Sequence, residues 1–432
     1  MTDAARASGR SLRLLAPLRI RDFRLLWTGM TVSLFGDGAF MVAVAWAAYE
    51  ISDAPGALAV IGIATSLPQV ALLLVGGAIS DRVDRRHVMI ASDVVRALAI
   101  GALAALAIAG TLELWHMVVL TAVYGAAAAF FGPAFDAVVP DVVPEHQLAE
   151  ANALDQFVRP AVLRLAGPAL GGVGIAAAGA GWGFAINAAS FAVSAACIAG
   201  MRRSGAPSDP AGGASLVAEM REGFRYVRGR TWLWGTFAGA TISYLLFMGP
   251  TEVLLPYIVK HELGGGADVL GAVFAAGGIG ALTAAVIMGQ RGTPRRNMTF
   301  ILIAWSLATL AVAGYGLAVA SWQLMLASLV FNALETAGLV VWGTTKHRLV
   351  PPRLMGRVSS VDWFISIALV PVSFALTAPV AAALGARTTL VAAGIVGAVV
   401  TLGCLFLPGM RAIERHRDAR ADPTPHAAPS TP

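Results

Sequence analysis

Long apolar segments alternate with short polar ones along the whole chain, and this pattern predicts its secondary structure. A helix of about twenty apolar residues crosses the roughly 30 Å hydrocarbon core of a bilayer. The chain holds twelve segments of that kind, six on each side of a polar break, over residues 25–49, 57–79, 88–110, 115–138, 148–178, 180–201, 231–257, 267–289, 298–318, 322–345, 357–383 and 386–408. We therefore predict an all-α membrane protein with twelve transmembrane helices.

The polar break divides the chain into two halves. Residues 202–215, RRSGAPSDPAGGAS, are rich in glycine, proline and serine and cannot build a core. In residues 216–227, apolar positions recur on one helical face, which predicts a short amphipathic helix lying on the membrane. We expect a basic segment over 1–24, a six-helix bundle over 25–201, a linker over 202–230, a second bundle over 231–409 and a disordered tail over 410–432.

The charges are few and unevenly placed. Hydrophobic residues make up 57% of the chain and charged residues 13%, too few to cover a soluble protein. With both termini in the cytoplasm, 26 of the 31 lysines and arginines fall in cytoplasmic segments, as the positive-inside rule requires. This placement explains the net charge of +6, so we expect no nucleic-acid partner. We expect a multi-pass protein of the plasma membrane, with the bilayer as its surroundings.

The second half repeats features of the first. VPEHQLAEANALDQF (143–157) and VPPRLMGRVSSVDWF (350–364) align without gaps at an offset of 207, and Cys197 and Cys404 share this offset. Four pairs are identical: Val143/Val350, Pro144/Pro351, Asp155/Asp362 and Phe157/Phe364. A duplication of this kind predicts two six-helix halves related by an axis along the membrane normal.

The most charged short loop lies between the second and third apolar segments. GGAISDRVDRR (76–86) resembles the signature loop of the major facilitator superfamily, Gly-x-x-x-Asp-Arg-x-Gly-Arg-Arg. Asp84 stands where many members have glycine, and the matching residues are Gly77, Asp81, Arg82, Arg85 and Arg86. The internal repeat brings the N-terminus of the eleventh helix, near Val358 and Ser359, to the same cytoplasmic face. Because a helix N-terminus favours a carboxylate, we expect Asp81 to form a conformational latch there between the two halves. The resemblance implies in addition that Arg85 reaches Asp136.

A second motif refines the resemblance. RLAGPALGG (164–172) matches the helix-5 antiporter motif of the superfamily at Gly167, Pro168, Gly171 and Gly172, while its two earlier glycines are Leu154 and Leu163 here. Together with residues 130–157, it resembles the branch that contains macrolide-efflux proteins and the enterobactin exporter. The resemblance implies a secondary transporter, although the fourth helix lacks the arginine of the best-known drug antiporters.

Three carboxylates inside the apolar segments are candidates for proton or substrate binding, because a charge within the bilayer is costly and usually faces a cavity or a partner. Asp37 lies near the middle of the first span between Gly36 and Gly38, and Glu335 near the middle of the tenth. Glu252 follows Pro250 in the seventh span. Asp37 has two other interpretations, a structural partner for a buried arginine or a hydrogen-bonded acid without either role. Glu252 alternatively is a solvated residue near the outer mouth.

Two pairs of opposite charge have helical spacing. Asp155 and Arg159 are four residues apart, and Asp93 and Arg96 are three apart. Each pair can simply neutralise itself, whereas a free Arg159 would suit an anionic substrate. Residues 264–280 are rich in glycine but follow no strand and contain no P-loop lysine, which indicates close helix packing and no phosphate site.

No metal cluster or nucleophile triad is evident, so we expect no cofactor and no enzymatic activity. The leading hypothesis is a secondary transporter that exports a small, largely hydrophobic molecule such as a drug, a macrolide-like natural product or a siderophore. It would act as a monomer by alternating access, with protons as the coupling ion. Two alternatives stay open: an importer of a nutrient or lysophospholipid, and a membrane sensor that does not transport.

Overall fold

The computed structural model describes residues 15–202 and 216–414, and in these ranges it is almost wholly helical, with no strand. Twelve helices are long and apolar enough to cross a membrane, as predicted. The helices of the first half are α2 (Arg21–Ile51), α3 (Pro55–Arg82), α4 (Arg85–Ile108), α5 (Leu114–Val142), α6 (Leu148–Arg159), α7 (Gly167–Ala178) and α8 (Ala180–Ala199). Those that follow are α9 (Leu216–Arg228), α10 (Thr231–Tyr257), α11 (Ala267–Arg291), α12 (Asn297–Leu317), α13 (Ser321–Leu349), α14 (Pro352–Ala368), α15 (Val370–Leu384) and α16 (Ala386–Gly403).

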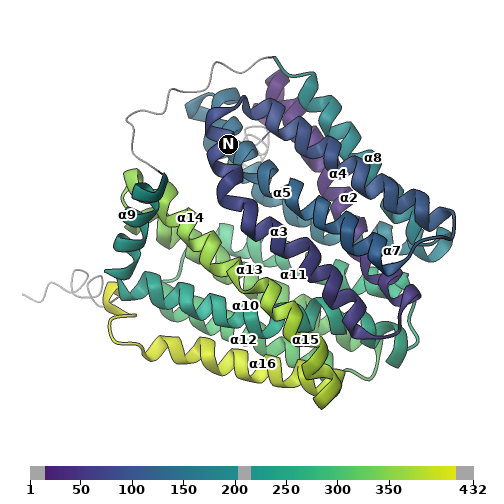
Figure 1. Ribbon diagram of the computed structural model, residues 1–432. Helices are drawn as coiled ribbons and strands as arrows, with labels where there is room; N and C mark the ends of the chain where they lie inside the picture. Colours follow the sequence, from purple (N-terminus) through teal and green to yellow (C-terminus); the bar gives the residue numbers. More distant parts are fainter. Residues whose placement is uncertain (1–14, 203–215, 415–432) are drawn as a thin grey trace, which may run out of the picture.

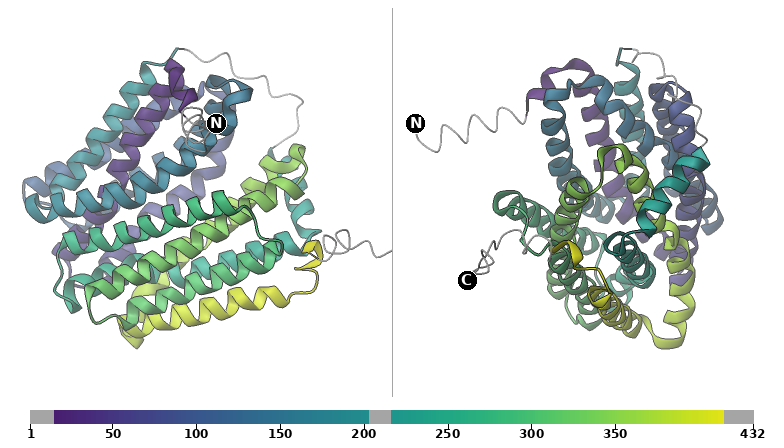
Figure 2. Two further views of the ribbon diagram at one scale, coloured as in Figure 1. Left: turned by 180° about the vertical axis from the view of Figure 1, so that it is seen from behind. Right: turned by 90° about the vertical axis from the view of Figure 1, so that its left-hand side faces the viewer.

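The helices form two groups, α2–α8 (the N-half) and α10–α16 (the C-half), which Figure 1 shows side by side. The groups meet where α7 packs against α11 and α3 against α15. α2 begins and α16 ends at the same end of the molecule, here called the termini end. Figures 1 and 2 show the two groups converging at the opposite end and diverging toward the termini end.

The hydrophobic core has the same arrangement. At the opposite end, one cluster of buried residues contains members of both halves, among them Tyr49 and Phe247. At the termini end the core separates: one cluster around Trp342 belongs to the C-half, and another around Met89 belongs to the N-half. Among the described residues, the buried apolar cluster that both halves share therefore lies at the end opposite the termini.

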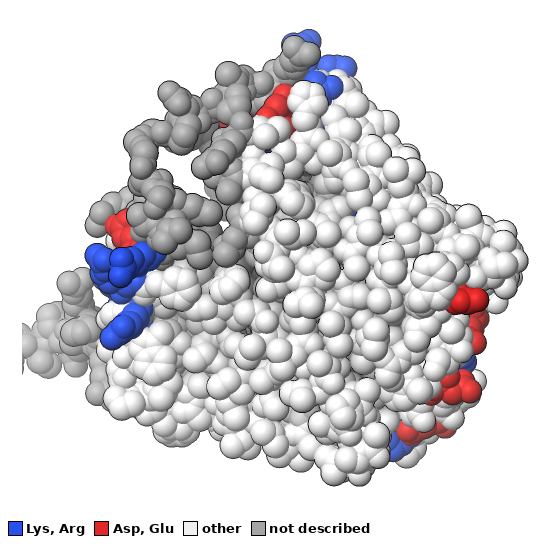
Figure 3. Space-filling model, viewed as in Figure 1, with Lys and Arg blue, Asp and Glu red and all other residues white. Residues whose placement is uncertain are grey.

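The outer surface matches a membrane protein. Large apolar side chains such as Leu98, Ile108 and Val399 are exposed on the helices, which suits contact with lipid tails. Figure 3 shows a broad face without charge, with lysine and arginine gathered over α9 at the termini end.

Two predicted spans are interrupted, and at equivalent places. A π-helix, η3 (Pro160–Ala166), separates α6 from α7, and α14 ends one residue before α15 begins, at Leu369. At the offset of 207, Leu369 corresponds to Val162 within η3. The duplication seen in the sequence therefore extends to the breaks in the fifth and eleventh spans.

The start of the first helix, the linker helix and the C-terminal tail can each be compared with their predicted bounds. α2 already begins at Arg21, inside the segment predicted as basic and non-spanning, after a short 3₁₀ turn at Ala16–Arg19. α9 is helical as predicted, and Val227 is buried while Phe224 stays exposed. The C-terminal tail was predicted to be disordered over 410–432, but residues 410–414 pack on the C-half: Met410 is buried, and Glu414 accepts hydrogen bonds from Thr299. Residues 415–432 lie outside the described ranges.

Candidate functional site

The main polar contact between the halves lies partway along the helices. The Arg164 guanidinium, on η3 of the N-half, donates to the Glu335 carboxylate of α13 across 3.1 Å. It also donates to the side-chain oxygen of Asn332, one helical turn away on α13. Glu252 and Tyr244 of α10 lie within electrostatic range of the same guanidinium. One arginine thus faces polar side chains from two helices of the C-half, α10 and α13.

The local sequence explains how Arg164 reaches this point. Pro160 has no N–H and cannot complete a regular helical ladder, and the π-helical turns of η3 follow it directly. Such wide turns occur mostly at functional positions. The backbone of Arg164 lies against Gly278 of α11, where a Cβ atom would be only 2.7 Å from the Arg164 carbonyl.

The glycines of the helix-5 motif let three helices approach closely. A Cβ atom on Gly167 or Gly171 would clash with α2 at Gly38 and Ala39. Gly172 faces α11. A Cβ atom on Gly271 of α11 would in turn lie only 2.4 Å from the carbonyl oxygen of Pro168. The glycine-rich stretch of α11 therefore serves close packing between the halves, as predicted from the sequence.

Asp37 belongs to a separate polar cluster within the N-half. Its Oδ1 accepts a hydrogen bond from the Tyr124 hydroxyl at 3.0 Å and from the Asn187 amide at 3.5 Å. α2, α5 and α8 supply these three residues. Asp37 is therefore hydrogen-bonded in this structure and is not in direct contact with Arg96 or Arg159, although both act on it electrostatically.

The two pairs with helical spacing form as the sequence suggests. Asp93 and Arg96 are hydrogen-bonded, with side-chain exposures of 0% and 6%, and the guanidinium lies between the rings of Phe131 and Phe191. These contacts fit structural neutralisation.

Asp155 and Arg159 are 3.2 Å apart, and Arg159 also approaches the sulfur of Met30 at 3.8 Å. Arg159 is thus paired and not a free cation. Asp136 lies near both of them, within electrostatic range.

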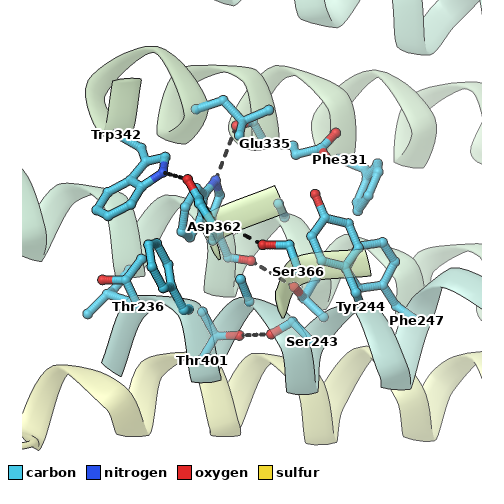
Figure 4. Close-up of a pocket in the computed structure, with 18 of the residues that line it drawn as sticks. Thr236, Ser243, Tyr244, Phe247, Phe331, Glu335, Trp342, Asp362, Ser366 and Thr401 are labelled. Atoms are coloured by element: carbon cyan, nitrogen blue, oxygen red, sulfur yellow. Dashed lines mark hydrogen bonds between the residues drawn. The ribbon is translucent and has the colours of Figure 1, made fainter. Parts of the chain in front are cut away.

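A cavity of about 230 Å³ lies inside the C-half, next to Glu335. α10, α12, α13, α14 and α16 form its wall. Figure 4 shows Phe331, Tyr244 and Phe247 on one side and Trp342 and Asp362 on the other. Glu252 of α10 is partly buried and lies within electrostatic range of Arg164.

A second ion pair lies on the cavity wall. The Lys346 ammonium is 2.9 Å from Asp362 Oδ2, which also accepts a hydrogen bond from the Trp342 indole at 3.1 Å. The sequence reasoning named Asp362 but did not find Lys346 as its partner. The sequence did not pair Arg164 with Glu335 either, although an arginine in one half and a carboxylate in the other, both near the middle of a span, were an available signal.

The signature loop has a local structural role that the motif alone does not reveal. Asp84 is the N-cap of α4, where its carboxylate accepts from the Arg86 backbone N–H at 3.0 Å and lies 3.2 Å from His87. Arg86 donates to the backbone carbonyls of Ile198 and Ala199 at the C-terminus of α8. A cation there is favourable because those carbonyls have no helical partner.

One expectation about this loop is wrong. Arg85 donates to Asp141 at 2.6 Å and to the Ala137 carbonyl at 3.2 Å, and not to Asp136. Positions 137 and 141 share a face of α5, whereas Asp136 is turned by about 140° from Asp141 at 100° per residue. The side chains of Asp81 and Arg82 and the surroundings of Gly77 lie outside the described part, so the predicted contact of Asp81 with α14 stays a prediction.

Comparison with known proteins identifies the architecture. A major facilitator family model described as "Transmembrane secretion effector" matches residues 13–427. The chain belongs to this family. It is 27% identical to the multidrug efflux pump Tap of Mycobacterium tuberculosis (strain H37Rv) over 407 residues, covering 90% of this chain and 93% of Tap. Macrolide efflux protein A of Streptococcus pyogenes is 22% identical over 411 residues, covering 91% of this chain and 97% of that protein.

Solved structures support the same fold. A bacterial homologue of the iron transporter ferroportin, in an inward-facing state, superposes with a TM-score of 0.67 at 17% identity, covering 90% of this chain and 98% of that one. The chain is therefore a multi-pass membrane transporter of the major facilitator type, as its signature loop indicated.

Proposed function

We propose that this transporter exports a small, largely hydrophobic molecule by alternating access, in exchange for protons. The observation that carries the proposal is the Arg164–Glu335 ion pair, which joins the two halves beside an apolar cavity. A contact of this kind can form and break as the halves rock about a central site. The similarity to multidrug and macrolide efflux proteins favours export of a drug-like compound.

The termini end faces the cytoplasm in this proposal. The positive-inside distribution of lysine and arginine supports that orientation, and the exposed arginines of α9 lie at the same end. The cross-half bonds at the opposite end then close the outer side: the Tyr49 hydroxyl donates to the Val253 carbonyl at 2.6 Å, and Lys260 donates to the Tyr49 carbonyl. With its core divided at the termini end, the protein is inward-facing.

Protons are the proposed coupling ion, and Asp37 and Glu335 are the proposed carriers. A proton on Glu335 would remove its attraction for Arg164 and so weaken the contact between the halves. Asp37 has a tyrosine and an asparagine as hydrogen-bond partners, which keeps it positioned in either protonation state. The protein would act as a monomer in the plasma membrane.

The signature loop supplies the opposing contact in the outward-facing state. Asp81 at the C-terminal end of α3 would meet the N-terminus of α14 when the termini end closes, because a helix N-terminus favours a carboxylate. Asp81→Asn should therefore shift the labelling of cysteines introduced into the inner cavity. Unchanged labelling would count against this latch.

The experiment that tests the function uses inverted membrane vesicles with an imposed pH gradient. Addition of a transported macrolide, other antibiotic or siderophore should dissipate the gradient, as measured by recovery of a quenched pH-sensitive dye. Vesicles that contain Asp37→Asn protein, at equal expression, should show no recovery. A gradient that no compound dissipates in wild-type vesicles would contradict proton-coupled export.

A further inference from the structure

The position and lining of the C-half cavity indicate which molecules it can bind. It lies among α10, α12, α13, α14 and α16, within one half of the transporter. Aromatic side chains supply much of its wall: Phe237, Tyr244, Phe247, Trp305, Phe331 and Trp342. Figure 4 shows several of these rings around the space, together with the hydroxyls of Ser243 and Thr401. Such a wall suits an aromatic molecule and offers ring faces that attract a cation.

The charges on the wall do not balance. The described lining contains two carboxylates, Glu335 and Asp362, and one ammonium, Lys346. Asp362 is neutralised within the C-half, because it forms an ion pair with Lys346. It also accepts hydrogen bonds from the Trp342 indole and, at 3.5 Å, from the Ser366 hydroxyl. Glu335 has no such partner there: among the described residues, the cation bonded to it is Arg164 of the N-half. Among the described residues of the C-half that line the cavity, the charges therefore sum to one excess negative charge.

An excess charge in apolar surroundings requires neutralisation. Arg164 supplies it in the present structure, but 40% of the Arg164 side chain is exposed while only 13% of Glu335 is. The guanidinium can thus withdraw more easily than the carboxylate can. Trp305 donates to the backbone carbonyl of Glu335 at 3.3 Å, so this turn of α13 stays fixed on the cavity wall.

We propose that the C-half cavity is a binding site for aromatic monocations, and that the bound cation takes the place of Arg164 at Glu335. The aromatic body occupies the space between Trp305, Phe331 and Tyr244, and its positive charge lies at the Glu335 carboxylate. Binding of the cation then breaks the Arg164–Glu335 contact between the two halves, which links substrate binding to movement of the halves. A neutral molecule gains no such contact, and an anion is repelled by Glu335.

This assignment rests on the proposed transport function, because it names the substrate class of that same protein. Binding is nevertheless measurable without transport. The matched probes are methyltriphenylphosphonium, an aromatic monocation, and triphenylphosphine oxide, a neutral molecule of nearly the same shape. Equilibrium dialysis against the purified full-length protein, corrected for empty micelles, gives the dissociation constant of each.

Three variants decide the question. Glu335→Gln should weaken phosphonium binding about tenfold or more, the value of one partly buried charge contact, and leave oxide binding unchanged. Arg164→Gln should tighten phosphonium binding several-fold, because it removes the competing cation. The double variant Glu262→Gln/Arg387→Gln removes an ion pair that lies outside the cavity lining, and it should bind phosphonium within about twofold of wild type.

The outcomes separate the two proposals. Wild-type protein that binds the oxide as tightly as the phosphonium, or an Arg164→Gln variant that binds the cation more weakly, would overturn the monocation site. So would a folded Glu335→Gln variant with wild-type affinity for the cation. Cation binding that depends on Glu335, without any transport in vesicles, would overturn the transport proposal and leave the site standing.

Discussion

Arg164 and Glu335 form an ion pair of 3.1 Å between the two halves, although 171 residues separate them in the sequence. Arg164 comes from a π-helical segment that interrupts the fifth span, and Glu335 comes from the middle of an unbroken helix. The pair therefore couples a locally irregular segment of one half to a rigid helix of the other.

Removal of one partner should cost more than removal of both. Arg164→Ala leaves a carboxylate that is 13% exposed without its cation. We expect a loss of about 2 kcal/mol in the free energy of unfolding, below the 3–5 kcal/mol of a fully buried pair because Arg164 is partly exposed. The double variant Arg164→Ala/Glu335→Gln should be more stable than Arg164→Ala alone. Thermal unfolding in detergent measures both, and additive losses would mean that the two residues do not interact.

Transport should depend on the carboxylate of Asp37 more than on its hydrogen bonds. Asp37→Asn keeps the shape of the side chain but cannot carry a proton, so we expect loss of pH-gradient-driven transport with normal expression. Tyr124→Phe removes one hydrogen bond, worth about 1 kcal/mol, and should reduce transport only partly. Uptake into inverted vesicles compares the three proteins. An active Asp37→Asn variant would remove Asp37 from the mechanism.

The close approach of α11 to the N-half should be intolerant of side chains. Gly271 faces the Pro168 carbonyl at a distance that a Cβ atom cannot occupy, whereas Gly289 on the same helix has open space around it. Gly271→Leu should force the halves apart at the end opposite the termini and abolish transport. Gly289→Leu is the matched control and should transport normally.

A cysteine introduced near the outer end of α11 measures the separation of the two halves through its accessibility to a thiol-labelling reagent. Labelling of the Gly271→Leu variant should rise over that of the Gly289→Leu control. Equal labelling, with transport retained in both variants, would show that the contact is adaptable.

The sequence predicted the elements of this fold well because membrane spans leave a strong signal in composition. Twelve apolar segments, the linker helix and the two intrahelical charge pairs all follow from local spacing. Cross-half contacts do not, because they depend on how helices far apart in the chain are rotated against each other. The Arg164–Glu335 pair joins the two halves, and the Lys346–Asp362 pair joins α13 to α14 within the C-half, so neither follows from the spacing of residues along one helix.

Arg85 illustrates the limit of a motif. The resemblance implied Asp136 as its partner, and α5 does supply the carboxylate, but from Asp141. A motif predicts which helix a residue contacts more reliably than it predicts which residue of that helix is the partner. Five residues along an α-helix correspond to more than one full turn, so two candidate partners five residues apart point in different directions.

Asp84 should stabilise the start of α4 through its side chain. Its carboxylate accepts from the Arg86 backbone N–H, and two consecutive arginines at this N-terminus add positive charge where the helix dipole already has it. Asp84→Ala should therefore lower the free energy of unfolding by about 1 kcal/mol, as expected for loss of an N-cap, and Asp84→Asn by less. Thermal unfolding of the purified variants distinguishes them. Asp84→Gly should lower the free energy of unfolding by only a few tenths of a kcal/mol. It should leave transport intact, because many proteins with this signature loop have glycine at the same position. A larger loss of transport than of stability in Asp84→Gly would instead give Asp84 a part in the movement of the loop.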